Sequence, residues 1–423
     1  MQLSRLTASQ LIRSTSHVLT GKVSTGVLSV ITFIVMAKIL TVQEIGSFSF
    51  FLSISAMVSV AANWGLNEYI LKQGTSTPDE IGNFVHASRL LKGIIGIGIG
   101  ILVGVYLSLH SPNLIYVLTF LFVLMSVLVD SQTVSIVMAF RTKGSTRFEA
   151  LLYPTRSLAR LLLVLVVSEI ARSLLLIVAG LFLINVLWLS LANRYYLSAG
   201  FSRQTVKLTA AYLFGIAKKA SPFVLVTLIG ITYTKADHIM LGMMKGEHEI
   251  GIYAVAWQLY ETALFLPVSL QLVLLPRFVK LFEATDQWLI KSNDCFKLSL
   301  ALGASMGILL FFLAPYPVYV IFGNKYAEST NIMKILMIAY IFRFVWTCLI
   351  STALISSNNM NVLNRILIFS LFLNIGVNAY CIPHYGPVGA AYSTVISDFF
   401  AFILGAVWLL RFRFDVKNAL VIE

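Results

Sequence analysis

Charged residues are scarce in this chain of 423 residues. Only 12% of the residues are charged, whereas 58% are hydrophobic. Such a composition cannot supply a charged shell around a core in water, which excludes the ordinary soluble globular class. The protein is therefore predicted to fold within a lipid bilayer.

Cysteines and targeting signals are also sparse. The three cysteines, Cys295, Cys348 and Cys381, are spaced too widely for a disulfide framework or a metal site, so we assign them to packing. Residues 1–20 contain no apolar core followed by a small-residue cleavage site, and no removable secretory signal is expected. The first apolar segment is then its own insertion signal.

Nucleotide-binding loops are missing as well. Gly96 to Gly100 reads GIGIG, but it lies inside an apolar segment without the strand, turn and helix that aim backbone donors at phosphate. Gly96, Gly100 and Gly104 instead form a small-residue face suited to close helix packing. The chain has no Walker-type loop either, so a built-in ATP motor is not expected.

Long apolar segments, by contrast, recur along the chain. A hydrocarbon layer about 30 Å thick requires roughly 20 apolar residues per helix. The sequence predicts an all-α polytopic membrane protein with about twelve transmembrane helices. The predicted spans are residues 17–39, 44–70, 88–109, 113–139, 149–169, 173–196, 211–234, 250–275, 296–322, 330–356, 362–382 and 387–410.

The formal net charge of +13 is interpreted by position. With these spans, roughly 24 of the 31 Lys and Arg residues fall at the termini or in even-numbered loops. Positive residues favour the cytoplasmic side, so both termini are predicted to be cytoplasmic. The charge encodes orientation, and no nucleic-acid partner is expected.

The two halves of the chain share a short motif where the first and seventh spans end. Glu44-Ile45-Gly46 and Glu249-Ile250-Gly251 occupy equivalent hairpin positions. Because six spans precede the second half, both copies would have the same orientation in the membrane. We expect two six-helix lobes, residues 1–205 and 206–423, around a central cavity.

Polar residues inside spans are the next signal, because lipid-facing polar groups are costly. Two spans carry polar stripes at helical spacing, which either line a cavity or bond helices together. These residues are Ser55, Ser59, Asn63 and Asn67 in the second span and Ser126, Asp130 and Thr133 in the fourth.

The fifth span contains two arginines on one helical face. About twenty residues back from the turn at Glu169 lies Glu149, so Arg156 and Arg160 enter the membrane. Guanidinium groups facing a wet cavity would bind phosphate oxygens through paired hydrogen bonds. The alternative is that they extend toward cytoplasmic headgroups, especially Arg156.

Polar and aromatic residues also gather in the seventh and eighth spans. Lys235 and Asp237 near the end of the seventh would contact substrate, relay protons or cap the helix. Tyr253, Trp257, Tyr260 and Glu261 form one face of the eighth, suited to stacking on sugar rings beside a carboxylate, although packing is an alternative role.

Further ionisable and amide groups occur in the last three spans. Arg343 and Asp398 are each a candidate for a substrate pathway or an ion pair, and the sequence does not indicate the partner of either. Asn374 and Asn378 share a face of the eleventh span. The acidic candidates for ion coupling are Asp130, Asp237, Glu261 and Asp398.

Six segments together resemble the polysaccharide transporters of the multidrug/oligosaccharidyl-lipid/polysaccharide (MOP) exporter superfamily, particularly Wzx-type O-antigen flippases. The segments are AKILTVQEIGSFSF from Ala37, NWGLNEYILKQ from Asn63, KADHIMLGMMKGEHEIGIYAVAWQLYE from Lys235, LPRFVKLFE from Leu275, IFGNKYAEST from Ile321 and YGPVGAAYSTVISD from Tyr385. Their order and spacing carry the resemblance over nearly the whole chain.

The resemblance implies a flippase of the bacterial inner membrane, with no catalytic residues, that moves undecaprenyl-pyrophosphate-linked oligosaccharide by alternating access. A diphosphate bearing sugars cannot cross hydrocarbon cheaply. The phosphates would be held by four cations, Arg156, Arg160, Lys235 and Arg343. The glycan would be accommodated by polar and aromatic residues, Ser59, Asn63, Asn67, Tyr253, Trp257 and Tyr260.

The resemblance leaves proton or sodium coupling open and implies no metal or other cofactor. A polysaccharide polymerase and a chain-length regulator are the implied protein partners.

Two alternatives come from different classes. An organic-cation antiporter of the same superfamily would favour an acidic cavity, against the arginines placed here. A membrane glycan polymerase or ligase would need a large outward loop carrying catalytic groups, and the outward connections are short. A purely structural scaffold leaves the intramembrane charges unexplained.

Overall fold

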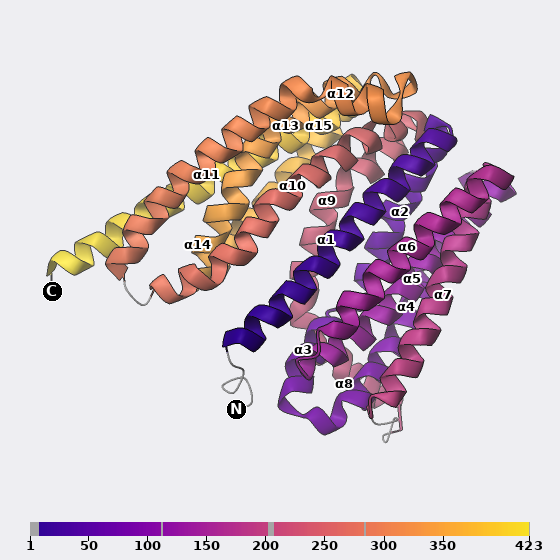
Figure 1. The fold of residues 1–423 in the computed structure, drawn as a ribbon, viewed down its shortest axis with the longest axis horizontal. Coiled ribbons are helices and arrows are strands. Elements are labelled where there is room, and N and C mark those ends of the chain that lie inside the picture. Colours follow the sequence, from indigo (N-terminus) through magenta and orange to yellow (C-terminus); the bar gives the residue numbers. More distant parts are fainter. Residues whose placement is uncertain (1–7, 111–112, 202–206, 283–284, 423) are drawn as a thin grey trace. The chain divides into compact units, whose positions relative to one another are not determined.

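Helices make up the regular structure of this protein (Figure 1). The computed structural model describes residues 8–110, 113–201, 207–282 and 285–422, and no strand occurs among them. Within these ranges, ten helices are long and apolar enough to cross a membrane, or eleven if one bent pair counts as a single span. The chain is thus an all-α, multi-pass membrane protein. The extreme ends, residues 1–7 and 423, lie outside the described residues, so the cytoplasmic placement of the termini stays a prediction.

Residues 1–44 and 48–231 form one compact unit. Within it, α1 lies beside α6, and α5 packs against α4 and α7. Its elements are α1 (Ala8–Ile39), α2 (Val42–Asn63), α3 (Leu66–Ser76), η2 (Pro78–Glu80), α4 (Ile81–His110), α5 (Leu114–Thr142), α6 (Arg147–Ile170), α7 (Leu174–Ser198), α8 (Ala210–Ala220), η3 (Ser221–Phe223) and the start of α9 (Val224–Lys245).

Residues 45–47 and 232–423 form the second compact unit. In this unit α13 packs against α10, α11 and α15. Its elements are the rest of α9, α10 (Glu247–Phe282), α11 (Thr285–Leu313), α12 (Pro315–Pro317), η4 (Val318–Phe322), η5 (Asn324–Tyr326), α13 (Ser329–Val345), η6 (Trp346–Ile350), α14 (Ser351–Ser356) and α15 (Met360–Ile422). The lobe boundary between residues 205 and 206 stays a prediction.

The second predicted span is one segment in sequence but two helices in the structure. Trp64 and Gly65 adopt left-handed φ values of 46° and 70°, which end α2 and separate it from α3. The predicted span 44–70 lies within the single candidate membrane segment Val42–Ser76, whose helix is interrupted at these two residues. Gly65 fits because a Cβ there would lie 2.5 Å from the carbonyl oxygen of Ala220.

The predicted seventh span, residues 211–234, is also interrupted. Proline lacks a backbone N–H and disrupts a continuing helix, and Pro222 lies in the short helix η3 that separates α8 from α9. The ninth span likewise ends early, because α11 stops at Leu313, just before Pro315. In both places proline accounts for the difference from the apolar pattern.

The longest helix, α15, contains a reversal at Gly386. Its φ of 56° and ψ of −135° are not helical, and 63 uninterrupted residues would extend about 95 Å, far beyond a bilayer. Across the reversal, the Ser393 hydroxyl donates to the Asn374 carbonyl at 2.8 Å. A Cβ on Gly389 would lie 2.3 Å from the Cys381 carbonyl oxygen. The segments before and after Gly386 therefore run antiparallel, with the reversal between predicted spans 362–382 and 387–410.

The glycine face of α4 has the packing role predicted for it. A Cβ on Gly96 would lie 2.6 Å from Leu128, and one on Gly100 would lie 2.4 Å from Leu124. Both leucines belong to α5, which packs against α4. The glycines thus allow close approach of two apolar helices.

We predict that Gly65→Ala destabilises the protein by about 1–3 kcal/mol, because it combines a positive φ with a steric clash. Gly98→Ala in α4 is the matched control, since its Cβ would meet no atom within 4 Å. Thermal unfolding in detergent measures both. Equal unfolding temperatures for the two variants would contradict this assignment of Gly65.

Candidate substrate and ion sites

A polar pocket of about 280 Å³ lies within the first unit. Helices α2, α3 and α5 supply most of its wall, and the start of α9 supplies Thr227. Its lining residues are Ser59, Val60, Asn63, Asn67, Glu68, Val127, Asp130, Ser131, Val134 and Thr227. Three residues of the predicted stripe in the second span, Ser59, Asn63 and Asn67, therefore meet Asp130 of the fourth span at one hollow.

The break between α2 and α3 shapes one wall of this pocket. Asn63 ends α2, and its Oδ1 accepts the backbone N–H of Asn67 at 3.2 Å, so it caps the new helix. The same side chain donates from Nδ2 to the Glu68 carboxylate at 3.3 Å. The two asparagines thus remain together although the helix joining them is broken.

Lys92 lies behind this wall and is the main polar residue that the sequence interpretation missed. Its side chain is 1% exposed although it comes from α4, a membrane helix. The ammonium donates to Asn67 Oδ1 at 2.7 Å, to the Ser131 carbonyl at 3.2 Å and to Ser135 Oγ at 2.7 Å. Lys92 therefore joins α4 to two walls of the pocket.

The predicted arginine pair of the fifth span separates into two environments. Arg156 is buried, forms an ion pair with Asp130 and lies over the Tyr153 ring at 5.1 Å. Headgroup contact is therefore not the arrangement seen for Arg156. Asp130 stays one-third exposed in its side chain and lines the pocket.

Arg160, one turn further along α6, has only a neutral partner among the described residues. Its Nη2 donates to Asn185 Oδ1 at 2.6 Å, and Asn185 in turn donates to Ser126 Oγ at 2.7 Å. The Arg160 Nε is buried without a hydrogen-bond acceptor in the described chain. Its positive charge is therefore held in place but not neutralised by a carboxylate. Arg160 lies about 15 Å along the helix from the end of α6, well inside the membrane segment.

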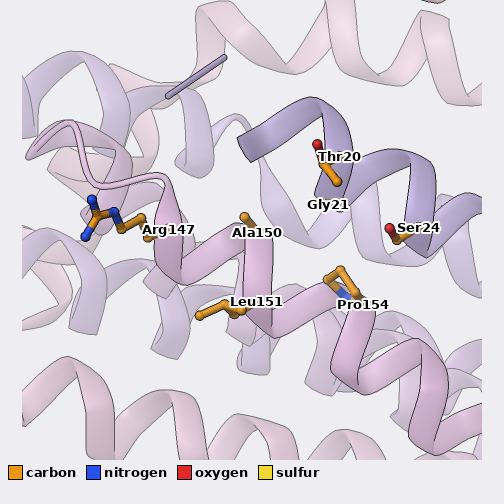
Figure 2. Close-up of a pocket in the computed structure, with 7 residues that line it drawn as sticks. All are labelled: Thr20, Gly21, Ser24, Arg147, Ala150, Leu151 and Pro154. Carbon is orange, nitrogen blue, oxygen red and sulfur yellow. The ribbon is translucent and has the colours of Figure 1, made fainter. Parts of the chain in front are cut away.

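A second hollow, of about 370 Å³, lies between α1 and α6 (Figure 2). Thr20, Gly21 and Ser24 of α1 face Ala150 and Pro154 of α6 across it. Arg147 and Leu151 complete its lining. None of its lining residues is among the predicted site residues.

In the second unit, the half-buried Arg343 forms an ion pair with the buried Asp398. Arg343 Nη2 lies 3.0 Å from Asp398 Oδ1, and the Arg343 guanidinium sits over the Tyr233 ring at 4.8 Å. Tyr233 and Tyr260 donate hydroxyl hydrogen bonds to the same carboxylate at 2.6 and 3.2 Å. The ion-pair interpretation of Arg343 and Asp398 therefore describes the geometry seen.

Asp237 is buried in the same unit with a different set of partners. Its carboxylate accepts hydrogen bonds from Tyr253 at 2.9 Å, Asn378 at 2.6 Å and Thr394 at 2.9 Å. All three donors are neutral, and no ion pair to Asp237 occurs in the described part of the chain. Asn374 extends the network by accepting from Asn378 at 3.0 Å.

The predicted aromatic face of the eighth span is buried within this unit. Tyr253 and Trp257 stack with ring centroids 5.8 Å apart, and Trp257 lies 5.3 Å from Tyr260. Two of the hydroxyls bind Asp237 and Asp398, so this face serves packing and carboxylate binding here. Glu261 is exposed, away from these hydrogen bonds, and Lys235 is half-buried.

The sequence identified most of the buried charged groups but missed several of their hydrogen-bond partners. Glu68, Asn185 and Thr394 each contact a predicted site residue. Lys92 gave a usable signal, because an isolated lysine within an apolar segment is costly unless it is partnered. Asn185 and Thr394 gave none, because their contacts join segments 25 and 157 positions apart. Glu68 is only five positions from Asn63, but their contact spans the interruption between α2 and α3. The roles of the predicted residues in substrate binding and ion coupling stay predictions.

Comparison with known proteins places the chain in a family. Residues 11–282 match the polysaccharide biosynthesis proteins. The chain belongs to this family.

Its relatives include a capsular polysaccharide biosynthesis protein of Staphylococcus aureus, 28% identical over 51% of this chain and 54% of that protein. A probable low-salt glycan biosynthesis flippase of Haloferax volcanii is 24% identical over 43% of this chain and 39% of its own length. The chain spans about half the length of the curated relatives it matches.

Solved structures identify the fold. The lipid II flippase MurJ, in an inward closed conformation, aligns with a TM-score of 0.73 and 14% identity over 96% of this chain and 90% of that one. An inward-facing multidrug resistance transporter of the MATE family and MOP superfamily aligns with a TM-score of 0.68 and 15% identity, over 93% and 96%. The family member thus has a MOP-type transporter fold, as the sequence resemblance predicted.

We predict that Arg343→Met destabilises the protein by about 3–5 kcal/mol, because it leaves the buried Asp398 carboxylate without its cation. Asp398→Asn should destabilise it by less, because Arg343 is partly exposed. The double variant should lose clearly less than the sum, since it removes both charges. Thermal unfolding of the four proteins forms a double-mutant cycle. Strict additivity would contradict the ion pair.

Proposed function

We propose that this protein is a flippase that moves an undecaprenyl-pyrophosphate-linked oligosaccharide, an O-antigen or related repeat unit, from the cytoplasmic to the periplasmic leaflet of the bacterial inner membrane. The family assignment and the MOP-type fold support a transporter of lipid-linked glycan over an enzyme. One geometric observation carries the proposal: Arg160 lies deep in α6 and forms no ion pair with a carboxylate of the described chain.

Arg160 suits a diphosphate for two reasons. A guanidinium binds phosphate oxygens through paired N–H donors, and the buried Nε of Arg160 has no acceptor among the described residues. Arg156 is one turn away, held by Asp130, and would reach an anionic ligand by exchanging that partner. Lys235 and Arg343 are the proposed cations of the second unit, with Arg343 already paired.

The proposed transport cycle is alternating access in a twelve-helix protein with two six-helix lobes and cytoplasmic termini. Ser59, Asn63 and Asn67 would contact the glycan from the pocket of the first unit. Tyr253, Trp257 and Tyr260 are proposed to stack on sugars after a conformational change that uncovers them. A polymerase and a chain-length regulator would act on the delivered repeat unit.

Coupling to a proton or sodium gradient is proposed to act through Asp237. Asp130 and Asp398 are neutralised by arginines, whereas the partners of Asp237 are neutral oxygen and amide groups. A buried carboxylate without a cationic partner favours binding a proton or a small cation. Glu261 is exposed and is the weaker candidate.

The organic-cation antiporter is the second candidate. Its supporting observation is the pair of carboxylates, Glu68 and Asp130, at the pocket of the first unit. Lys92 and Arg156 offset these charges, so the glycan flippase is the better-supported function.

Purified protein in liposomes that carry a fluorescent undecaprenyl-diphosphate-linked oligosaccharide tests the function. We expect Arg160→Ala to slow translocation by roughly 10- to 100-fold, since a hydrogen bond to a charged group contributes about 1.5–3 kcal/mol. Arg160→Lys should retain part of the rate because it keeps the charge. Wild-type translocation by the alanine variant at equal protein amounts would reject a required cationic contact.

A separate experiment concerns coupling. Asp237→Asn should make translocation insensitive to an imposed proton or sodium gradient, because the amide cannot carry the negative charge that binds the ion. Glu261→Gln is the matched control and should keep the gradient response. An unchanged response in the Asp237 variant would exclude it as the coupling site.

A further inference from the structure

Two carboxylates line the pocket of the first unit, and two cations bond residues of its lining. Glu68 and Asp130 line it directly. Arg156 pairs with Asp130, and Lys92 bonds Asn67 and the carbonyl of Ser131, both of which also line it. The four formal charges therefore sum to zero.

This balance decides which ligand chemistry suits the pocket. A phosphate group in this pocket would be repelled by the two carboxylates of the wall. The two cations that bond the lining already have oxygen partners, so they would not offset this repulsion. An organic cation would be repelled by Lys92 and Arg156, which cancel the attraction of the acids. A neutral, hydroxyl-rich ring needs interspersed donors and acceptors without net charge, and this wall supplies them.

The hydrogen-bond inventory supports a hydroxyl-rich ligand. Glu68 uses one carboxylate oxygen for Asn63, and Asp130 uses one for Arg156, so each keeps an acceptor oxygen that no described residue bonds. Asn67 accepts from Lys92 through Oδ1, which leaves its Nδ2 available as a donor. Ser59 adds a hydroxyl that can both donate and accept, whereas the Thr227 hydroxyl donates to the Val224 carbonyl at 2.9 Å and adds an acceptor.

Lys92 both supplies positive charge beside the pocket and holds lining groups in place. Its ammonium has three N–H donors and three oxygen partners, one on α3 and two on α5. It thereby fixes which way the Asn67 amide points. Removing it would free the amide to turn and would leave the pocket with net negative charge.

We propose that this pocket is a subsite for a neutral sugar ring of the transported glycan, and that Lys92 is the positioning residue that sets its selectivity against cations. The inference rests on the proposed function and deepens it, because it names the ligand chemistry of this pocket. It separates the sugar-binding pocket from Arg160, the proposed diphosphate contact.

Binding to purified protein tests the proposal with three probes: undecaprenyl diphosphate, the same lipid bearing one N-acetylglucosamine, and tetraphenylphosphonium. Wild-type protein should prefer the sugar-bearing lipid. Lys92→Met should reduce that preference by about tenfold, the loss of roughly 1.4 kcal/mol of hydrogen bonding. It should bind the bare lipid as before and acquire tetraphenylphosphonium binding.

Two variants serve as controls for a merely structural effect. Arg89→Met removes a cation from the same helix, but Arg89 bonds Asn193 and does not line the pocket, so neither preference should change. Lys92→Arg should keep cations out because it keeps the charge.

Glu68→Gln provides an independent arm if Lys92→Met fails to fold. This conservative change makes the pocket net positive, so it should weaken the sugar preference without admitting tetraphenylphosphonium. An unchanged sugar preference in this variant would overturn the subsite. A folded Lys92→Met protein that keeps its sugar preference and excludes tetraphenylphosphonium would overturn the role of Lys92.

The wild-type protein separates this inference from the proposed function. Equal binding of the two lipids would overturn the sugar subsite while leaving a diphosphate-lipid transporter intact. Binding of neither lipid would overturn the proposed function and the subsite together.

Discussion

A charged side chain inside a membrane helix costs roughly 3 kcal/mol or more unless another group offsets it, and the interior of this protein is arranged around that cost. The Lys92 ammonium donates hydrogen bonds to three oxygen atoms, and Arg156 forms an ion pair with an aspartate. Arg343 forms an ion pair with an aspartate and interacts with two tyrosines. Each arrangement joins two or more helices, consecutive ones for Lys92 and Arg156 and the separated helices α13 and α15 for Arg343. Charge compensation therefore also links helices within each unit.

The two units meet this constraint differently. In the first, charged groups border a pocket, and Arg160 keeps a charge that no carboxylate neutralises in the described chain. In the second, Asp237 and Asp398 are enclosed by tyrosine hydroxyls, amides and one arginine, with each acid less than 2% exposed. We interpret the first arrangement as suited to a large polar ligand and the second to a proton or a small cation.

The sequence predicted the helical membrane architecture, because apolar length is a strong signal that depends on local composition alone. It also selected Arg156, Asp130, Arg343 and Asp398, which form two ion pairs in the structure. It did not predict the break at Trp64 and Gly65, since a left-handed turn inside an apolar segment leaves the hydropathy unchanged. The pairings themselves required the fold, because Arg343 and Asp398 are 55 positions apart and meet only when α13 packs against α15.

The central claim is that this protein moves lipid-linked glycan between leaflets. The most direct measurement is the leaflet distribution of that glycan in spheroplasts, read by an external glycan-cleaving enzyme, with downstream polymerisation blocked and with or without the protein. We expect cleavable glycan to appear outside only when the protein is present. Equal accessibility in its absence would contradict the claim and favour a cation antiporter or an assembly role.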